Sequence, residues 1–128
     1  MNWRLLGIAA VIPCVLAATA SATCLMPLLK TDNRYCDGCR YEGTIGLNHN
    51  ETCERVSQVP QILGLDYQYV DSRIIQRAKH GIAGANGATI AYQPAKDFVG
   101  TDDFVMEMTY RENGKLGKYT AHYVVTVK

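Results

Sequence analysis

The 128-residue chain lacks a charge excess of either sign, and it lacks helical patterns. It has 13 lysine and arginine residues against 12 aspartate and glutamate residues, a formal net charge of +1. This balance argues against a basic nucleic-acid footprint and against electrostatic attachment to anionic lipid. No segment of ten or more residues shows a clean helical period, and the sequence contains no repeat or low-complexity tract.

The first 22 residues, MNWRLLGIAAVIPCVLAATASA, are predicted to form a secretory signal peptide. A single positive charge, Arg4, precedes an apolar run from Leu5 to Ala18 and the small residues Ala20-Ser21-Ala22, an order typical of such signals. A membrane-spanning helix, the main alternative, needs about 20 apolar residues, and Pro13 interrupts a shorter run here. We expect cleavage after Ala22 and a secreted or periplasmic mature chain without a transmembrane segment.

Four cysteines follow this cleavage site, Cys24, Cys36, Cys39 and Cys53, and none follows Cys53. An even number in a secreted chain indicates two disulfides, and the sequence leaves their three possible pairings open. A Cys24–Cys53 bridge would close a loop of roughly 30 residues and contribute on the order of 3–4 kcal/mol. A lipid anchor on Cys24 is an alternative that the preceding threonine disfavours. We expect a cysteine-rich segment at residues 23–53 and a β-sandwich domain at residues 54–128.

The CDGC stretch from Cys36 to Cys39 also has the spacing of thiol–disulfide oxidoreductases and of zinc sites. Redox chemistry needs the first sulfur at a helix N-terminus, and the following RYEGTIG does not favour a helix. Zinc would need further ligands, for which His49 and Cys53 are the candidates. A redox or zinc-binding protein remains an alternative, whereas structural disulfides predict no metal and no cofactor.

Alternating apolar residues predict two long strands near the C-terminus. One strand would place on a single face Phe104, Met106, Met108 and Tyr110. The next would do the same with Tyr119, Ala121, Tyr123, Val125 and Val127. Between them, Asn113-Gly114 favours a tight hairpin turn.

Shorter strands are expected upstream. Residues 88–92 (ATIAY) follow a second hairpin signal, Asn86-Gly87, and should point Ile90 and Tyr92 inward. Further candidates are residues 41–47 (YEGTIGL), 62–70 (ILGLDYQYV) and 72–78 (SRIIQRA), the last leading to a turn at Gly81. Six or seven short strands in about 100 residues predict an all-β fold, a β-sandwich.

A polar corner is expected between two of these strands, in the stretch YQPAKDFVGTDDF. Pro94 should end one strand because it cannot donate to a ladder, and Gly100 supplies a backbone shape that a β-carbon would oppose. Thr101 and Asp102 are expected to accept hydrogen bonds from nearby backbone N–H groups. The apolar side chains that should pack onto the core beside this turn are Phe98 and Phe104.

Several motifs between Ser72 and Lys128 carry a family resemblance. They are Lys79-His80-Gly81, Tyr92-Gln93-Pro94, the corner at residues 98–104 (FVGTDDF) and Val125-Thr126-Val127. On these motifs the chain resembles the bacterial immunoglobulin-like and cadherin-like domains of secreted and surface proteins. The resemblance implies a Greek-key sandwich used for display, adhesion or protein contact, without catalytic chemistry of its own.

For such a module, the expected partner is a protein or a component of the cell envelope. The polar face of the last two strands is the predicted contact surface, formed by Glu107, Thr109, Arg111, Thr120 and His122. An alternative is a small carbohydrate-acting enzyme that uses two of the acids Asp97, Asp102, Asp103 and Glu107. That chemistry needs two carboxyl groups with different pKa values in a cleft, so we interpret the three aspartates instead as the polar rim of the corner.

Overall fold

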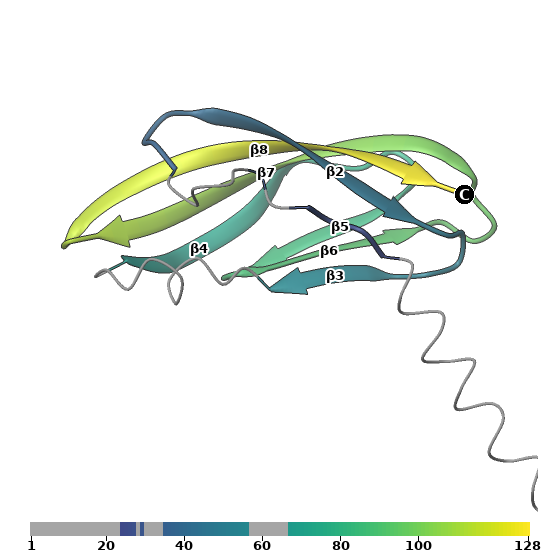
Figure 1. The fold of residues 1–128 in the computed structure, drawn as a ribbon, viewed down its shortest axis with the longest axis horizontal. Coiled ribbons are helices and arrows are strands. Elements are labelled where there is room, and N and C mark those ends of the chain that lie inside the picture. Colours follow the sequence, from purple (N-terminus) through teal and green to yellow (C-terminus); the bar gives the residue numbers. More distant parts are fainter. Residues whose placement is uncertain (1–23, 28, 30–34, 57–66) are drawn as a thin grey trace, which may run out of the picture.

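The computed structural model describes residues 24–27, 29, 35–56 and 67–128 (Figure 1). The predicted signal peptide, residues 1–22, lies outside the described residues. The strands are β2 (Arg40–Leu47), β3 (Cys53–Val56), β4 (Tyr67–Gln76), β5 (Gly81–Asn86), β6 (Thr89–Pro94), β7 (Gly100–Glu112) and β8 (Lys115–Val127). Within these ranges, no helix is long and apolar enough to cross a membrane.

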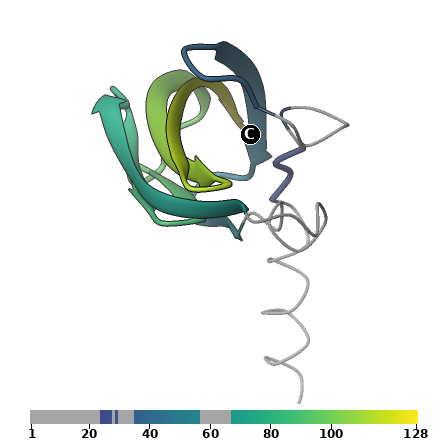
Figure 2. The ribbon, with the colours of Figure 1, turned by 90° about the vertical axis from the view of Figure 1, so that its left-hand side faces the viewer.

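The strands form two sheets that curve around one interior (Figure 2). The first has the order β2-β8-β7-β4 and the second the order β3-β6-β5. Only β5–β6 and β7–β8 are hairpins, and every other consecutive pair of described strands changes sheet. β2 pairs parallel with β8, although they lie far apart in the sequence. The predicted all-β sandwich is confirmed.

The long alternating strands face the core as predicted. All of the inward residues expected in β7 and β8 are buried, namely Phe104, Met106, Met108, Tyr110, Tyr119, Ala121, Tyr123, Val125 and Val127. The hairpin between the two strands turns at Asn113 and Gly114, whose φ values of 51° and 81° suit that dipeptide. The two-residue period of a strand therefore accounts for half of the core.

Aromatic stacking joins the two sheets at the centre. Phe104, on β7, is fully buried, and its ring lies 6.1 Å from that of Tyr92 on β6 and 5.3 Å from that of Tyr123 on β8. Ile90 and Tyr92 are both buried, as predicted. Because Tyr92 belongs to the other sheet from Phe104 and Tyr123, this stack fixes how the layers face each other.

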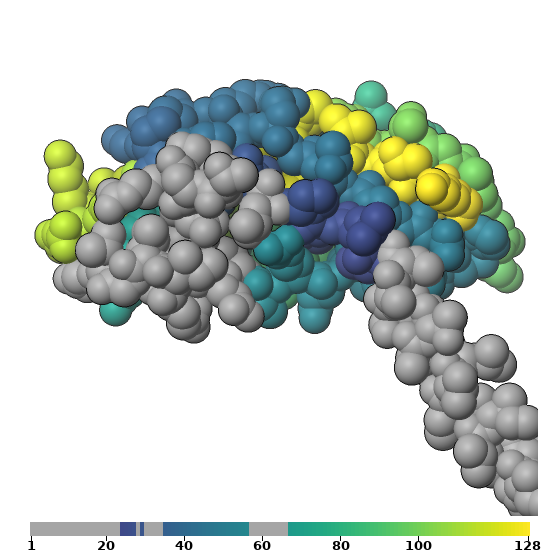
Figure 3. Space-filling model, in the orientation of Figure 1, coloured from purple at the N-terminus to yellow at the C-terminus, as the bar shows by residue number. Residues whose placement is uncertain are grey.

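The N-terminal segment closes one edge of the sandwich. The disulfides pair Cys24 with Cys53 and Cys36 with Cys39, which selects one of the three possible pairings. Cys24 is thereby linked to Cys53, the first residue of β3. Leu25, which follows Cys24, exchanges two backbone hydrogen bonds of 2.7 and 2.8 Å with Gly46 of β2. Figure 3 shows this segment in dark blue, seated between the residues of β2 and β3. One short segment thus ties together the edges of both sheets.

The β-sandwich also includes residues from the segment 23–53, which was expected to precede it. β2 lies within residues 23–53 and contributes the buried side chains of Ile45 and Leu47 to the core. Met26, in the disulfide-bonded segment, is buried too. The cysteine-rich segment is therefore packed into the same hydrophobic core as the later strands.

The upstream strands differ from the expectation in three ways. The two candidates at residues 62–70 and 72–78 contribute to one strand, β4, and residues 62–66 lie outside the described ranges. Register shifts near Val70 and Ile75 interrupt its pairing with β7, and such bulges break the alternation that would identify one strand. β3 and β5 were not predicted, because one has only four residues and the other is rich in glycine and alanine. Gly81 begins β5 rather than forming the turn before it.

Truncating Phe104 should destabilise the fold strongly. Phe104→Ala removes a fully buried ring, so we expect a loss of about 3–5 kcal/mol in unfolding free energy. Phe98→Ala should lose distinctly less, because Phe98 is only half-buried. Urea denaturation of both variants checks this order, and equal losses would contradict the central role of the Phe104 stack.

Candidate functional site

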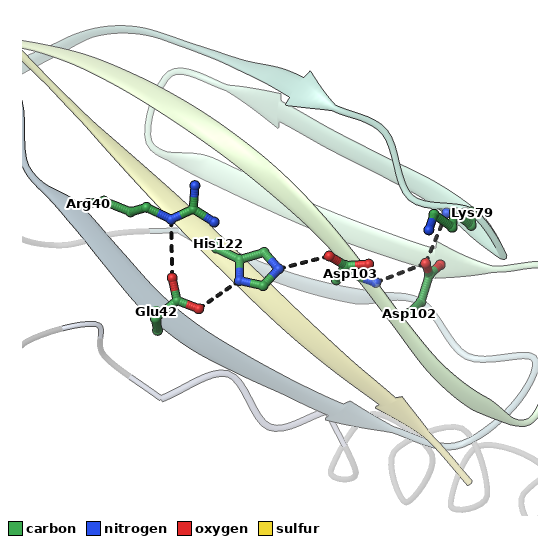
Figure 4. Close-up of polar contacts among 6 residues, drawn as sticks. All are labelled: Arg40, Glu42, Lys79, Asp102, Asp103 and His122. Carbon is green, nitrogen blue, oxygen red and sulfur yellow. Dashed lines mark hydrogen bonds and ion pairs between the residues drawn. The ribbon is translucent and has the colours of Figure 1, made fainter.

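The carboxylate of Asp102 is the centre of the corner, and it is buried. It accepts hydrogen bonds from the backbone N–H groups of Lys79 (2.9 Å), His80 (2.8 Å) and Asp103 (2.9 Å) and from the hydroxyl of Tyr92 (2.8 Å). Figure 4 shows it between Lys79 and Asp103. The prediction that Asp102 accepts backbone N–H groups is confirmed, with two of the donors coming from the link between β4 and β5.

These hydrogen bonds control the charge of Asp102. Burial alone would raise its pKa, but the bonds from Lys79, Tyr92, His80 and Asp103 favour the ionised form, and the pKa is lowered overall. The pKa of Tyr92 is raised by burial and by its bond to Asp102, which keeps its hydroxyl protonated as a donor. An anionic acceptor with four donors is suited to holding structure together.

The other corner residues lie largely as expected. Pro94 is the last residue of β6, and Gly100 has a φ of 143°, with the Phe98 ring 3.3 Å from the position of an added β-carbon. Phe98 also stacks on His80, with ring centroids 4.5 Å apart. Thr101, in contrast, is exposed.

The three aspartates do not form one polar rim, which corrects the interpretation from sequence. Asp102 points inward, whereas Asp103 lies on the outer face of β7 because successive strand residues alternate. Asp97 sits in the turn after β6 with a φ of 63°, and it exchanges hydrogen bonds of 2.8 and 3.0 Å with the side chain of Asn50. The acids suggested as a catalytic set are thus divided between the interior, the outer face and a separate turn.

A chain of polar contacts crosses three strands on the outer face of the four-stranded sheet (Figure 4). On β8, His122 places Nδ1 2.6 Å from Glu42 of β2 and Nε2 2.8 Å from Asp103 of β7. Arg40 extends the chain through a 3.3 Å contact with Glu42. We call Glu42, His122 and Asp103 the histidine bridge.

Two carboxylates favour the protonated form of His122. Only the imidazolium can donate from both ring nitrogens, and the hydrogen bonds with Asp103 and then Glu42 raise the pKa of His122 above its ordinary value of 6.5. The hydrogen bond from His122 in turn lowers the pKa of Glu42. The two carboxylates therefore keep His122 protonated to a higher pH than in a free histidine.

The predicted contact surface has its residues on one face of the β7–β8 hairpin. Glu107 lies opposite Thr120, Thr109 opposite Lys118, and Arg111 lies further along β7 toward the hairpin end. Glu107 is already engaged, with Arg73 of β4 at 3.0 Å and Lys118 at 3.9 Å. A hollow of about 360 Å³ lies over these ion pairs. This part of the face is therefore charged and hollowed.

The cysteines lie in settings that suit structural bridges. Cys36 and Cys39 flank a turn at Asp37-Gly38, where no helix begins, so the helix dipole that would lower a thiol pKa is missing at this position. Since both pairs are oxidised, neither offers thiolates to zinc, and His49, the other suggested ligand, contacts the backbone oxygen of Lys128 at 2.8 Å. In the described part of the chain, no three potential ligands cluster to hold a metal ion.

Comparison with known proteins adds no relative: no protein-family model matches the chain, and no curated protein is similar to it in sequence.

Sequence reasoning missed two members of the outer face, Arg40 and Glu42. Arg40 and Glu42 alternate with Tyr41 and Gly43 in the sequence. This alternation predicts that both charged residues lie on the polar face of a strand. What the sequence could not give was the parallel pairing that sets Glu42 directly opposite His122.

Removing the Asp102 carboxylate should destabilise the corner. Asp102→Ala leaves the N–H groups of Lys79 and His80 and the Tyr92 hydroxyl without this acceptor, so we expect a loss of about 3 kcal/mol at neutral pH. Thr101→Ala, its exposed neighbour, should change stability by no more than about 0.5 kcal/mol.

The same substitution predicts a pH dependence. Because the pKa of Asp102 is lowered in the folded state, its stabilisation is present above the ordinary aspartate range and is lost as pH falls through the lowered value. The difference in unfolding free energy between wild type and Asp102→Ala should therefore shrink in strong acid. Urea denaturation across pH measures it, and a difference independent of pH would contradict the role of the charge.

The histidine bridge predicts a shifted titration. In wild type, NMR should find His122 titrating above pH 6.5, and Glu42→Gln or Asp103→Asn should lower its pKa. Since the folded-state pKa is raised, the bridge stabilises the fold below pH 6.5 and loses this effect as pH rises through the raised value. Glu54→Gln, on exposed β3, is the matched control and should leave the His122 titration unchanged. An unshifted His122 in wild type would refute the bridge.

Proposed function

We propose that this protein is an immunoglobulin-like binding module without catalytic activity, acting in the periplasm or outside the cell. Its contact surface is the outer face of the four-stranded sheet, around Glu107, Thr109, Arg111, Thr120 and His122. Its partner is a protein or a component of the cell envelope. The observation that carries this proposal is the engagement of the candidate acids in bonds that hold the fold.

The strand order supports the immunoglobulin-like part of the proposal. In immunoglobulin domains the third, sixth and seventh strands form one sheet, and the second, fifth and fourth strands lie in the other. Counting from β2, the same positions are β4-β7-β8 and β3-β6-β5. Here the first strand pairs with the last one instead of joining the second sheet.

The engaged acids argue against general acid–base catalysis. Asp102 already accepts four hydrogen bonds, Asp103 holds His122, and Glu107 pairs with Arg73 and Lys118. A glycosidase needs one carboxyl group with a raised pKa, and the pKa of Asp102 is lowered. Binding through a charged face places no such demand on these groups.

The disulfides support the compartment. Bridges at Cys24–Cys53 and Cys36–Cys39 suit an oxidising environment. A signal peptide at residues 1–22 would deliver the chain to the periplasm or the exterior.

Site-specific cross-linking tests the proposed face. A photoreactive residue at Arg111, exposed on the face, should capture a partner in the cells that make the protein, whereas one at Glu54, exposed on β3 of the other sheet, should not. The charge reversal Arg111→Glu should then reduce capture through a probe at Thr109 without changing the melting temperature. Equal capture from both sheets would contradict the proposed face, and substrate turnover lost on mutation of Asp103 in a stable fold would contradict the non-catalytic assignment.

A further inference from the structure

The four sheet edges of the described sandwich are unequally protected. The β2 edge is bridged by Leu25, and β3 is short and linked to Cys24. The β4 edge carries charges at Asp71 and Arg73 and two register irregularities. Such devices block pairing with another chain. The fourth edge, β5, carries none of them: its sequence GIAGAN has no charge, no proline and no register shift.

The outer edge of β5 has an ordered row of hydrogen-bonding groups. The β5–β6 hairpin closes on the pair Asn86–Thr89, so the residues bonded to β6 are Asn86, Gly84 and Ile82. The alternate residues, Gly81, Ala83 and Ala85, direct their N–H and C=O groups away from β6. In the described part of the chain, no strand pairs with this side of β5.

Space is available beside this edge. A hollow of about 380 Å³ lies between β4 and β5, lined by Ile74, Arg77, Ala78, Gly81, Ile82 and Ala83. Ile82 is 72% exposed, the most exposed large apolar side chain in the described residues. An apolar side chain next to free backbone groups is the combination that strand addition uses.

We propose that two copies of this chain pair through antiparallel β5 strands, with the two-fold axis at Ala83. In this register, Ala83 faces its own copy and Gly81 faces Ala85 of the second copy, so the outward N–H and C=O groups meet in hydrogen-bonded pairs. The two three-stranded sheets then join into one continuous sheet of six strands.

The side chains fit this register. Ile82 falls opposite Gly84 of the second copy, in a non-hydrogen-bonded pair whose side chains lie close together. A β-carbon on Gly84 would find no atom within 4 Å, so open space lies where Ile82 of the second copy would rest. β5 carries no charge, so two identical strands meet without repulsion. These points favour a second copy over an unrelated peptide as the occupant.

Sedimentation velocity across a concentration series tests the proposal. The purified wild-type protein should sediment increasingly as a dimer with concentration. Ile82→Lys should weaken dimerisation by about tenfold or more, since it places charges near the two-fold axis. Leu116→Lys, at a site 56% exposed on β8, is the matched control and should dimerise like wild type.

A second variant tests the register. Gly84→Val fills the open space without a clash inside one copy, so the melting temperature should be kept while dimerisation weakens. A wild-type protein that stays monomeric at high concentration would overturn the proposal. So would equal effects of Ile82→Lys and Leu116→Lys, or undiminished dimerisation of Gly84→Val.

Discussion

The arrangement of the strands depends on the hydrogen bonds that the buried carboxylate of Asp102 accepts. A charge in the interior is tolerated only where hydrogen bonds replace its hydration, and here they come from the β4–β5 link, from Tyr92 of β6 and from the backbone of β7 itself. Asp102 thereby connects a strand of each sheet, β7 and β6, with the link that joins the two sheets. Two residues further on, Phe104 enters the aromatic stack in register. The same register of β7 therefore places both Asp102 among its donors and Phe104 in the aromatic stack.

The two sheets are joined differently on the two sides of the sandwich. At β2 and β3, Cys24 and Leu25 fasten one sheet to the other by a covalent bond and by a backbone bridge. At β4 and β5, the sheets are joined through the link that Asp102 holds, and a hollow lies between them. Links close the β2 and β3 edges, and β4 carries charges and register shifts, so the backbone pairing that we propose lies at β5.

Much of this fold could be predicted, because burial imposes a period of two on long strands. β7, β8 and their inward residues were therefore predicted from the sequence, as was the Asn113-Gly114 turn. The bulged β4 and the glycine-rich β5 broke or lacked that period, so one was divided and the other missed. The candidate site was less predictable, since Glu42 and His122 meet only through a parallel pairing that local sequence does not encode.

The two proposed contact surfaces lie on different sheets. The β5 edge belongs to the three-stranded sheet, whereas Arg111 and the histidine bridge lie on the outer face of the four-stranded one. A dimer through β5 would leave both polar faces uncovered. Two linked faces bind a repeated partner more tightly than one, because the second contact forms at a high effective concentration. Self-association and partner binding would then reinforce each other instead of competing for one surface.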